Sequence, residues 1–107
     1  MTHKEAFLKI TNFINDAVLI NLKSNEHEMA YQKHLLLSFA NSLEHQDKNY
    51  KRNIQILISM IERTVQVNMD HKDYIQADQI NLIYELARGL QNLVHDTPND
   101  LDITLLN

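Results

Sequence analysis

Hydrophobic positions recur with the spacing of an α-helix along most of this chain. In the first segment, Thr2 can cap a helix and Glu5, three residues later, can complete a capping box. The apolar residues that follow lie three or four positions apart, so they would share one helical face: Phe7, Ile10, Ile14, Ala17 and Val18. We therefore predict a first helix that ends near Lys23.

A second amphipathic segment follows after a short polar break. Ser24 and Asn25 can each cap a helix, and Glu28 stands three residues after Asn25. The polar stretch 44–49 then interrupts the pattern, and Asp47 is the predicted N-cap of the next helix. The second helix is expected to bury Met29, Leu36, Phe39, Ala40 and Leu43.

The third and fourth segments carry the clearest apolar stripes. Residues 68–72 form a polar break between them, after which Asp73 and Gln76 resemble a capping box. Gly89 lies inside the fourth stripe, where glycine costs about 1 kcal/mol relative to alanine. We expect it to allow close packing against another helix, with a functional kink as the alternative. The third stripe is Tyr50, Ile54, Leu57, Ile58, Ile61 and Val65, and the fourth is Ile80, Ile83, Leu86, Ala87, Leu90, Leu93 and Val94.

These elements predict an all-α protein. The chain has one glycine and one proline, and no run alternates apolar and polar residues long enough to indicate a strand. Thr97 and Pro98 should end the fourth helix, which leaves 97–107 as a short fifth helix or a tail. We predict a single domain over 1–107: an antiparallel up-down-up-down four-helix bundle with a short C-terminal helix or tail.

Composition narrows the classes of function. There is no cysteine, which rules out disulfides and thiolate metal sites. The formal charge of −4, with scattered basic residues, argues against a nucleic-acid partner. The longest apolar run, Ala17 to Ile20, is far below the roughly 20 residues of a membrane span. The N-terminal residues lack the character of a secretory signal, so we expect a cytoplasmic protein without a transmembrane segment.

One motif approaches metal chemistry. Residues 27–34 read HEMAYQKH, but the second histidine of an HExxH zinc site is replaced by Tyr31. His27 and His34 share a helical face yet lie about 10 Å apart, too far to hold one ion without another helix. No glutamate is followed three positions later by histidine, as a di-iron bundle requires, and no phosphate-binding loop or nucleophile elbow occurs. We expect no metal, no cofactor and no enzymatic activity.

The last seven residues contain four large apolar side chains. The segment is too short to be stable as an isolated helix, so these side chains must either pack on the bundle or remain available to a partner. They form the predicted partner-binding site: Leu101, Ile103, Leu105 and Leu106.

The C-terminal half also carries a family resemblance. The stretch ILISMIERTVQVNMDHKDYIQADQINLIYELARGL, residues 56–90, joins a long apolar helix to a second amphipathic helix through a short polar link that contains a tyrosine. In this layout, and at Tyr74, Leu82, Ile83 and Leu86, it resembles the immunity proteins of pediocin-like bacteriocins. The resemblance implies a small cytosolic four-helix bundle without cofactors, which protects the producing bacterium by recognising a bacteriocin-engaged membrane permease. It also implies that the C-terminal part sets specificity.

A second class of function stays open beside that resemblance. A small regulatory bundle, such as an adaptor or inhibitor, would act through protein–protein contacts and could form a homodimer. Both hypotheses involve a protein partner, and neither requires catalytic residues. An adjacent gene for a short secreted peptide would favour the immunity hypothesis.

Overall fold

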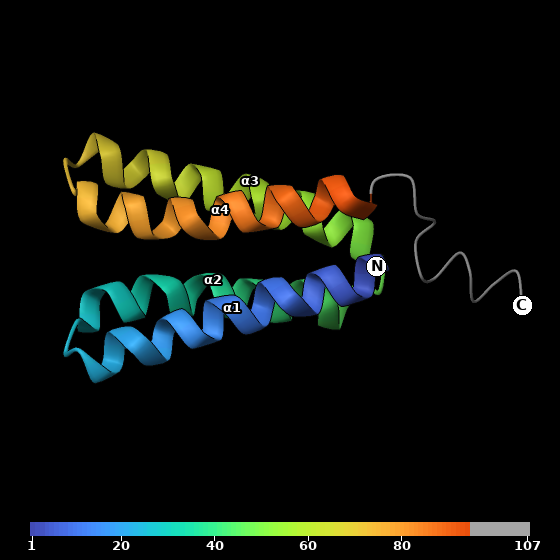
Figure 1. Cartoon of the computed structure of the whole chain (residues 1–107), viewed down its shortest axis with the longest axis horizontal. Helices are drawn as coiled ribbons and strands as arrows, with labels where there is room; N and C mark the ends of the chain where they lie inside the picture. The colour runs from blue at the N-terminus through green and yellow to red at the C-terminus, as the bar shows by residue number, and fades with distance from the viewer. Residues whose placement is uncertain (95–107) are drawn as a thin grey trace, which may run out of the picture.

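The computed structural model describes residues 1–94, and within this range the chain forms four helices and no strand (Figure 1). The prediction of an all-α protein is confirmed for these residues. Links of three residues each, 24–26, 47–49 and 71–73, join the helices. Figure 1 shows α1 beside α2 and α3 beside α4. The helices are α1 (His3–Lys23), α2 (His27–Gln46), α3 (Tyr50–Asp70) and α4 (Tyr74–Val94).

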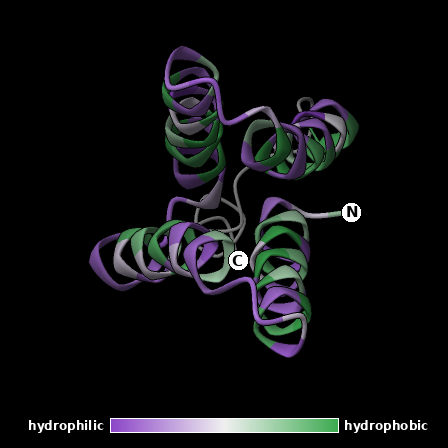
Figure 2. Ribbon diagram, turned by 90° about the vertical axis from the view of Figure 1, so that its left-hand side faces the viewer, coloured by the Kyte–Doolittle hydropathy of each residue, from purple (hydrophilic) through white to green (hydrophobic). Residues whose placement is uncertain are grey.

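All four helices contribute to one apolar core. Figure 2, which looks along the helices, shows them arranged around a common interior. The rings of Phe7 in α1 and Tyr50 in α3 lie with their centroids 5.6 Å apart, within the range of favourable aromatic contact. The core residues buried most completely include Phe7, Ile10, Ile14, Leu36, Ala40, Ile54, Leu57, Ile61, Ile80, Ile83 and Ala87.

Two helix starts agree with the sequence. The Thr2 hydroxyl accepts a hydrogen bond from the Glu5 backbone N–H at 3.1 Å. The Asp73 carboxylate accepts one from the Gln76 backbone N–H at 3.2 Å. The Gln76 side chain departs from a full capping box, because its amide donates to the other Asp73 oxygen at 2.8 Å instead of reaching the backbone.

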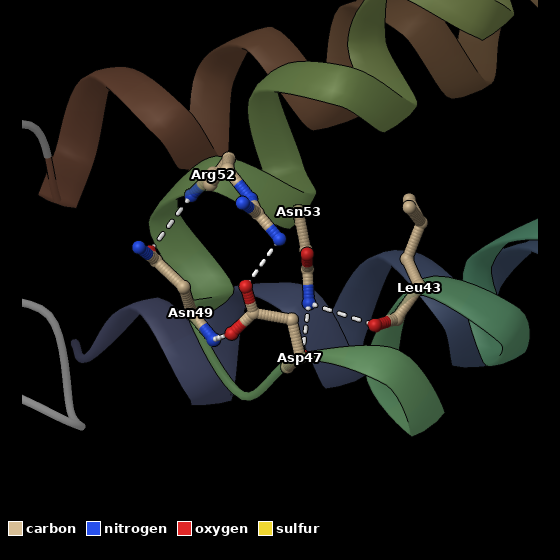
Figure 3. Close-up of polar contacts among 5 residues, drawn as sticks. All are labelled: Leu43, Asp47, Asn49, Arg52 and Asn53. Carbon is tan, nitrogen blue, oxygen red and sulfur yellow. Dashed lines mark hydrogen bonds and ion pairs between the residues drawn. The ribbon is translucent and has the colours of Figure 1, made fainter.

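The start of α3 corrects the predicted cap. Asp47 is the C-cap of α2, and Asn49 is the N-cap of α3, where its side chain accepts from the Arg52 backbone N–H (Figure 3). Asp47 instead accepts from the Asn49 backbone N–H at 2.8 Å and forms an ion pair with Arg52. Asn53 closes the link by donating to the backbone carbonyl of Asp47 at 2.8 Å. Asp47 therefore stabilises the link, while Asn49, which stands next to the first helical residue, supplies the cap.

The start of α2 also differs from the prediction. Ser24 is the C-cap of α1, and Asn25 adopts the left-handed conformation with φ 59°. Asparagine tolerates that region better than most residues. Glu26 occupies the N-cap position of α2 without a side-chain hydrogen bond to the helix. Both predicted caps are therefore used to end α1, because a three-residue link must terminate one helix before it starts the next.

Three details of burial also correct the sequence interpretation. Leu93, placed in the core stripe, is 70% exposed. A Cβ added to Gly89 would meet no atom within 4 Å, so the expected close packing at this glycine is wrong. The predicted polar break at 68–72 is also too long, because α3 continues to Asp70 and Asn68 is buried.

Candidate functional site

The predicted partner-binding residues Leu101, Ile103, Leu105 and Leu106 lie outside the described residues. Among residues 1–94, the surface of α4 supplies a different candidate. Ile75 is 66% exposed, Leu82 is 59% exposed and Leu93 is 70% exposed. Separations of seven and eleven residues return to nearly the same side of a helix, so these side chains share one flank of α4. Gly89 lies on that flank, seven residues after Leu82.

This flank of α4 faces away from α3. The Tyr84 hydroxyl donates to Glu62 of α3 at 2.9 Å, which fixes the side of α4 that adjoins α3. That hydrogen bond is also the main reason that the pKa of Tyr84 is raised. Leu82 points to the opposite side, because two residues rotate the helix by about 200°. The exposed apolar flank of α4 therefore adjoins α1, its other neighbour.

Helix α1 adds two apolar side chains on the adjoining side. Phe13 is 40% exposed and Ile20 is 63% exposed. The opposite side of α1 is marked by Val18 and Leu22, which line a shallow depression with Tyr31 of α2. Phe13 and Ile20 therefore flank α4, and Figure 1 shows α1 and α4 on the same side of the bundle. We call these residues the α1/α4 flank: Phe13, Ile20, Ile75, Leu82 and Leu93.

The interior near links 24–26 and 71–73 is polar. Lys33 of α2 is only 4% exposed, and its ammonium donates to the side-chain oxygens of Asn21 in α1 and Gln79 in α4. Burial lowers the pKa of Lys33, while the nearby Glu26 carboxylate acts in the opposite direction. Glu26 itself accepts from the Asn21 amide at 3.2 Å. This network joins three helices through one charged group.

A second polar contact joins α2 and α3 at the same end. The side-chain amides of Gln32 and Asn68 exchange two hydrogen bonds, at 3.1 and 2.9 Å. Amides that pair in this way help to align two helices, because a slip would break both hydrogen bonds. Lys33 and these amides thus have a structural explanation. The burial of Lys33 is indicated in the sequence by its position, because it continues with helical spacing the apolar stripe that contains Met29, Leu36 and Ala40.

The two histidines of the near-HExxH motif lie on the surface. His27 and His34 are exposed and line the depression between α1 and α2 together with Ala30 and Tyr31. In the part of the chain that the structure describes, no cluster of three or more histidine and acidic side chains could hold a metal. The arrangement offers two exposed imidazoles without a converging third ligand.

The chain matches no protein-family model, no curated protein and no solved structure. Within residues 1–94, no helix combines the length and apolar composition that a membrane span requires. Among residues 1–94, the α1/α4 flank is a group of exposed apolar side chains on two neighbouring helices.

Proposed function

We propose that this chain is a non-enzymatic helical bundle that binds another protein through the α1/α4 flank. The observation that carries the proposal is the exposure of five large apolar side chains on two adjacent helices. Single exposed apolar residues are ordinary, but a grouped set on a small monomer is typical of an interaction surface. The core does not need these side chains, since each helix also has a separate buried stripe.

The flank alone supports only a weak complex. Full burial of a large apolar side chain contributes about 1.5–3 kcal/mol, and the flank residues are between 40% and 70% exposed. Five such side chains would contribute on the order of 5 kcal/mol, near the lower end of the roughly 4–15 kcal/mol cost of association. Tight binding requires further contacts, and we propose that Leu101, Ile103, Leu105 and Leu106 supply them.

The particular function that we propose is bacteriocin immunity, with a bacteriocin-engaged membrane permease as the partner. Support comes from the resemblance over residues 56–90 and from four helices of similar length joined by short links. The finer architecture belongs to the same proposal: an antiparallel up-down-up-down bundle that acts in the cytoplasm. Links of three residues reach about 10 Å, far less than a helix length of about 30 Å, which favours reversal of direction at each link.

A protection assay tests the immunity proposal. The full chain, expressed in a strain sensitive to pediocin-like bacteriocins, should raise the bacteriocin concentration needed to stop growth. Truncation after Asp96 should leave a folded helical protein by circular dichroism but abolish protection. Equal protection by the truncated chain would remove the C-terminal residues from recognition. A full chain that protects against no such peptide would reject immunity.

The alternative is a regulatory adaptor or inhibitor bundle, which could act as a homodimer. The spacing within α4 favours this class of protein. Ile75, Leu82 and Gly89 recur every seven residues, and Leu86 and Leu93 form a parallel series. A seven-residue repeat of this kind is typical of a seam between two helices. Light scattering after size-exclusion chromatography, over a range of protein concentrations, would detect a homodimer.

Paired substitutions test the flank under either hypothesis. Leu82→Asp with Leu93→Asp should abolish protection or dissociate a dimer, because both carboxylates would be desolvated on binding. Leu35→Asp with Val67→Asp is the matched control, since these residues are 51% and 48% exposed on α2 and α3. Circular dichroism should show both variants folded. Loss of function in the control alone would place the binding surface on α2 and α3 instead.

A further inference from the structure

His3 is the most unusual buried polar residue among residues 1–94. Its side chain is 1% exposed, yet neither ring nitrogen has a hydrogen-bond partner within the described structure. Buried polar groups are nearly always paired, because an unpaired donor or acceptor loses its hydrogen bonds with water and gains none in return. An apolar side chain would fill the same space without this cost. The imidazole therefore calls for a partner other than the described side chains.

His3 lines a pocket that three helices form together. Lys51 and Gln55 come from the first two turns of α3, and Gln91 and Asn92 come from the last described turn of α4. The pocket has a volume of about 350 Å³, at the lower end of the range for small-molecule sites. The five lining residues that lie within 1–94 are all polar, and none of these five is acidic. This composition differs from the α1/α4 flank, whose defining residues are all apolar.

The charges around the pocket favour an anion. Lys51 supplies the charged side chain of the lining, and α1 and α3 both begin there. The N–H groups at a helix start carry partial positive charge, and the carbonyl groups at the nearby ends of α2 and α4 carry the opposite sign. Lys51 therefore supplies the net positive charge among the described lining residues. One imidazole beside an ammonium group is a poor cation site, because a metal needs several converging ligands. The glutamine amides can donate to an oxygen atom.

We infer that this pocket binds a small oxyanion, such as a phosphate or carboxylate group. His3 donates a ring N–H to one oxygen, and Lys51 and a glutamine amide donate to the others. A group with several acceptor oxygens is the ligand that these donors can satisfy together. This site is separate from the α1/α4 flank and does not depend on the proposed function.

The test follows the imidazole signals of the full chain by nuclear magnetic resonance. The protein is titrated with inorganic phosphate, and in a second series with acetate, while sodium chloride keeps the ionic strength constant. The His3 ring signals should shift saturably with at least one oxyanion, whereas the exposed His27, His34 and His71 should not. No saturable shift of His3 with either anion, or an equal shift with chloride alone, overturns the inference.

Two matched lysine variants separate the site from general charge effects. Lys51→Met keeps most of the side-chain stem and should weaken the affinity of the anion about tenfold, because it removes a charge-assisted hydrogen bond. Lys48→Met removes the same charge from an exposed neighbour in link 47–49 and should change the affinity less than about twofold. Equal weakening by both variants, or none by Lys51→Met, overturns the assignment. His3→Phe should abolish the anion response if it folds, and Lys51→Met decides the question if it does not.

Discussion

Gly89 allows a direct test of whether the α1/α4 flank is open to solvent. The residue lies inside α4, five positions before the last described helical residue, and it has no positive φ. An alanine Cβ would meet no atom within 4 Å, so Gly89→Ala introduces no clash. The substitution reduces the backbone freedom of the unfolded chain and leaves the folded contacts unchanged. We therefore expect the variant to be more stable than the natural chain.

The size of the effect follows from helix propensity. Glycine is about 0.8–1.0 kcal/mol less favourable than alanine at an exposed interior position of a helix. A gain close to this range would raise the melting temperature by roughly 4–8 °C for a domain of this size. Urea denaturation followed by far-ultraviolet circular dichroism should show a higher midpoint with an unchanged m-value, because the surface exposed on unfolding stays the same.

Gly89→Ser is the graded control. Serine lies between glycine and alanine in helix propensity, so its gain in stability should be smaller than that of alanine. A loss of stability in Gly89→Ala at low protein concentration would refute the open flank, because it would mean that atoms of the same chain occupy the space above Gly89. A loss that appears only at high concentration would instead indicate that a second copy packs there.

The remaining predictions concern the core, the histidine pair and the buried lysine. Leu57→Ala and Ile83→Ala should each lower the free energy of unfolding by about 2–5 kcal/mol, because both side chains are fully buried, and a loss below about 0.5 kcal/mol at both sites would contradict the core assignment. His27→Ala combined with His34→Ala should leave the melting temperature nearly unchanged with and without zinc, whereas a metal lost only from the double variant would contradict this. Because the pKa of Lys33 is lowered in the folded chain, the unfolded chain binds more protons than the folded chain at pH values below the ordinary pKa of 10.5. The contribution of Lys33 to the free energy of unfolding therefore rises as the pH increases toward 10.5. Lys33→Met should reduce that rise in denaturation curves measured at successive pH values, and an identical slope in both proteins would reject the role of Lys33.

Helical periodicity was enough to predict the four helices and most of the core. Phe7, Leu57 and Ile83 could be placed correctly because burial repeats with the period of the helix. Lys33 was missed because a lysine on an apolar stripe is normally expected to reach solvent. Its burial depends on oxygens from Asn21 and Gln79, which are distant in sequence, and the spacing within α2 does not reveal them.

The α1/α4 flank shows why the candidate site was harder to predict than the fold. Leu90 and Leu93 both continue the apolar pattern of α4, but Leu90 is 6% exposed and Leu93 is 70% exposed. A wide apolar stripe on a helix contains core residues at its centre and surface residues at its edge, and the position of the neighbouring helix decides where the edge falls. In α4 the apolar pattern extends beyond the part that α1 covers. The apolar character of Leu90 is explained by its burial in the core. Leu93, Ile75 and Leu82 instead expose apolar surface, and a partner could provide the apolar contacts that this surface lacks.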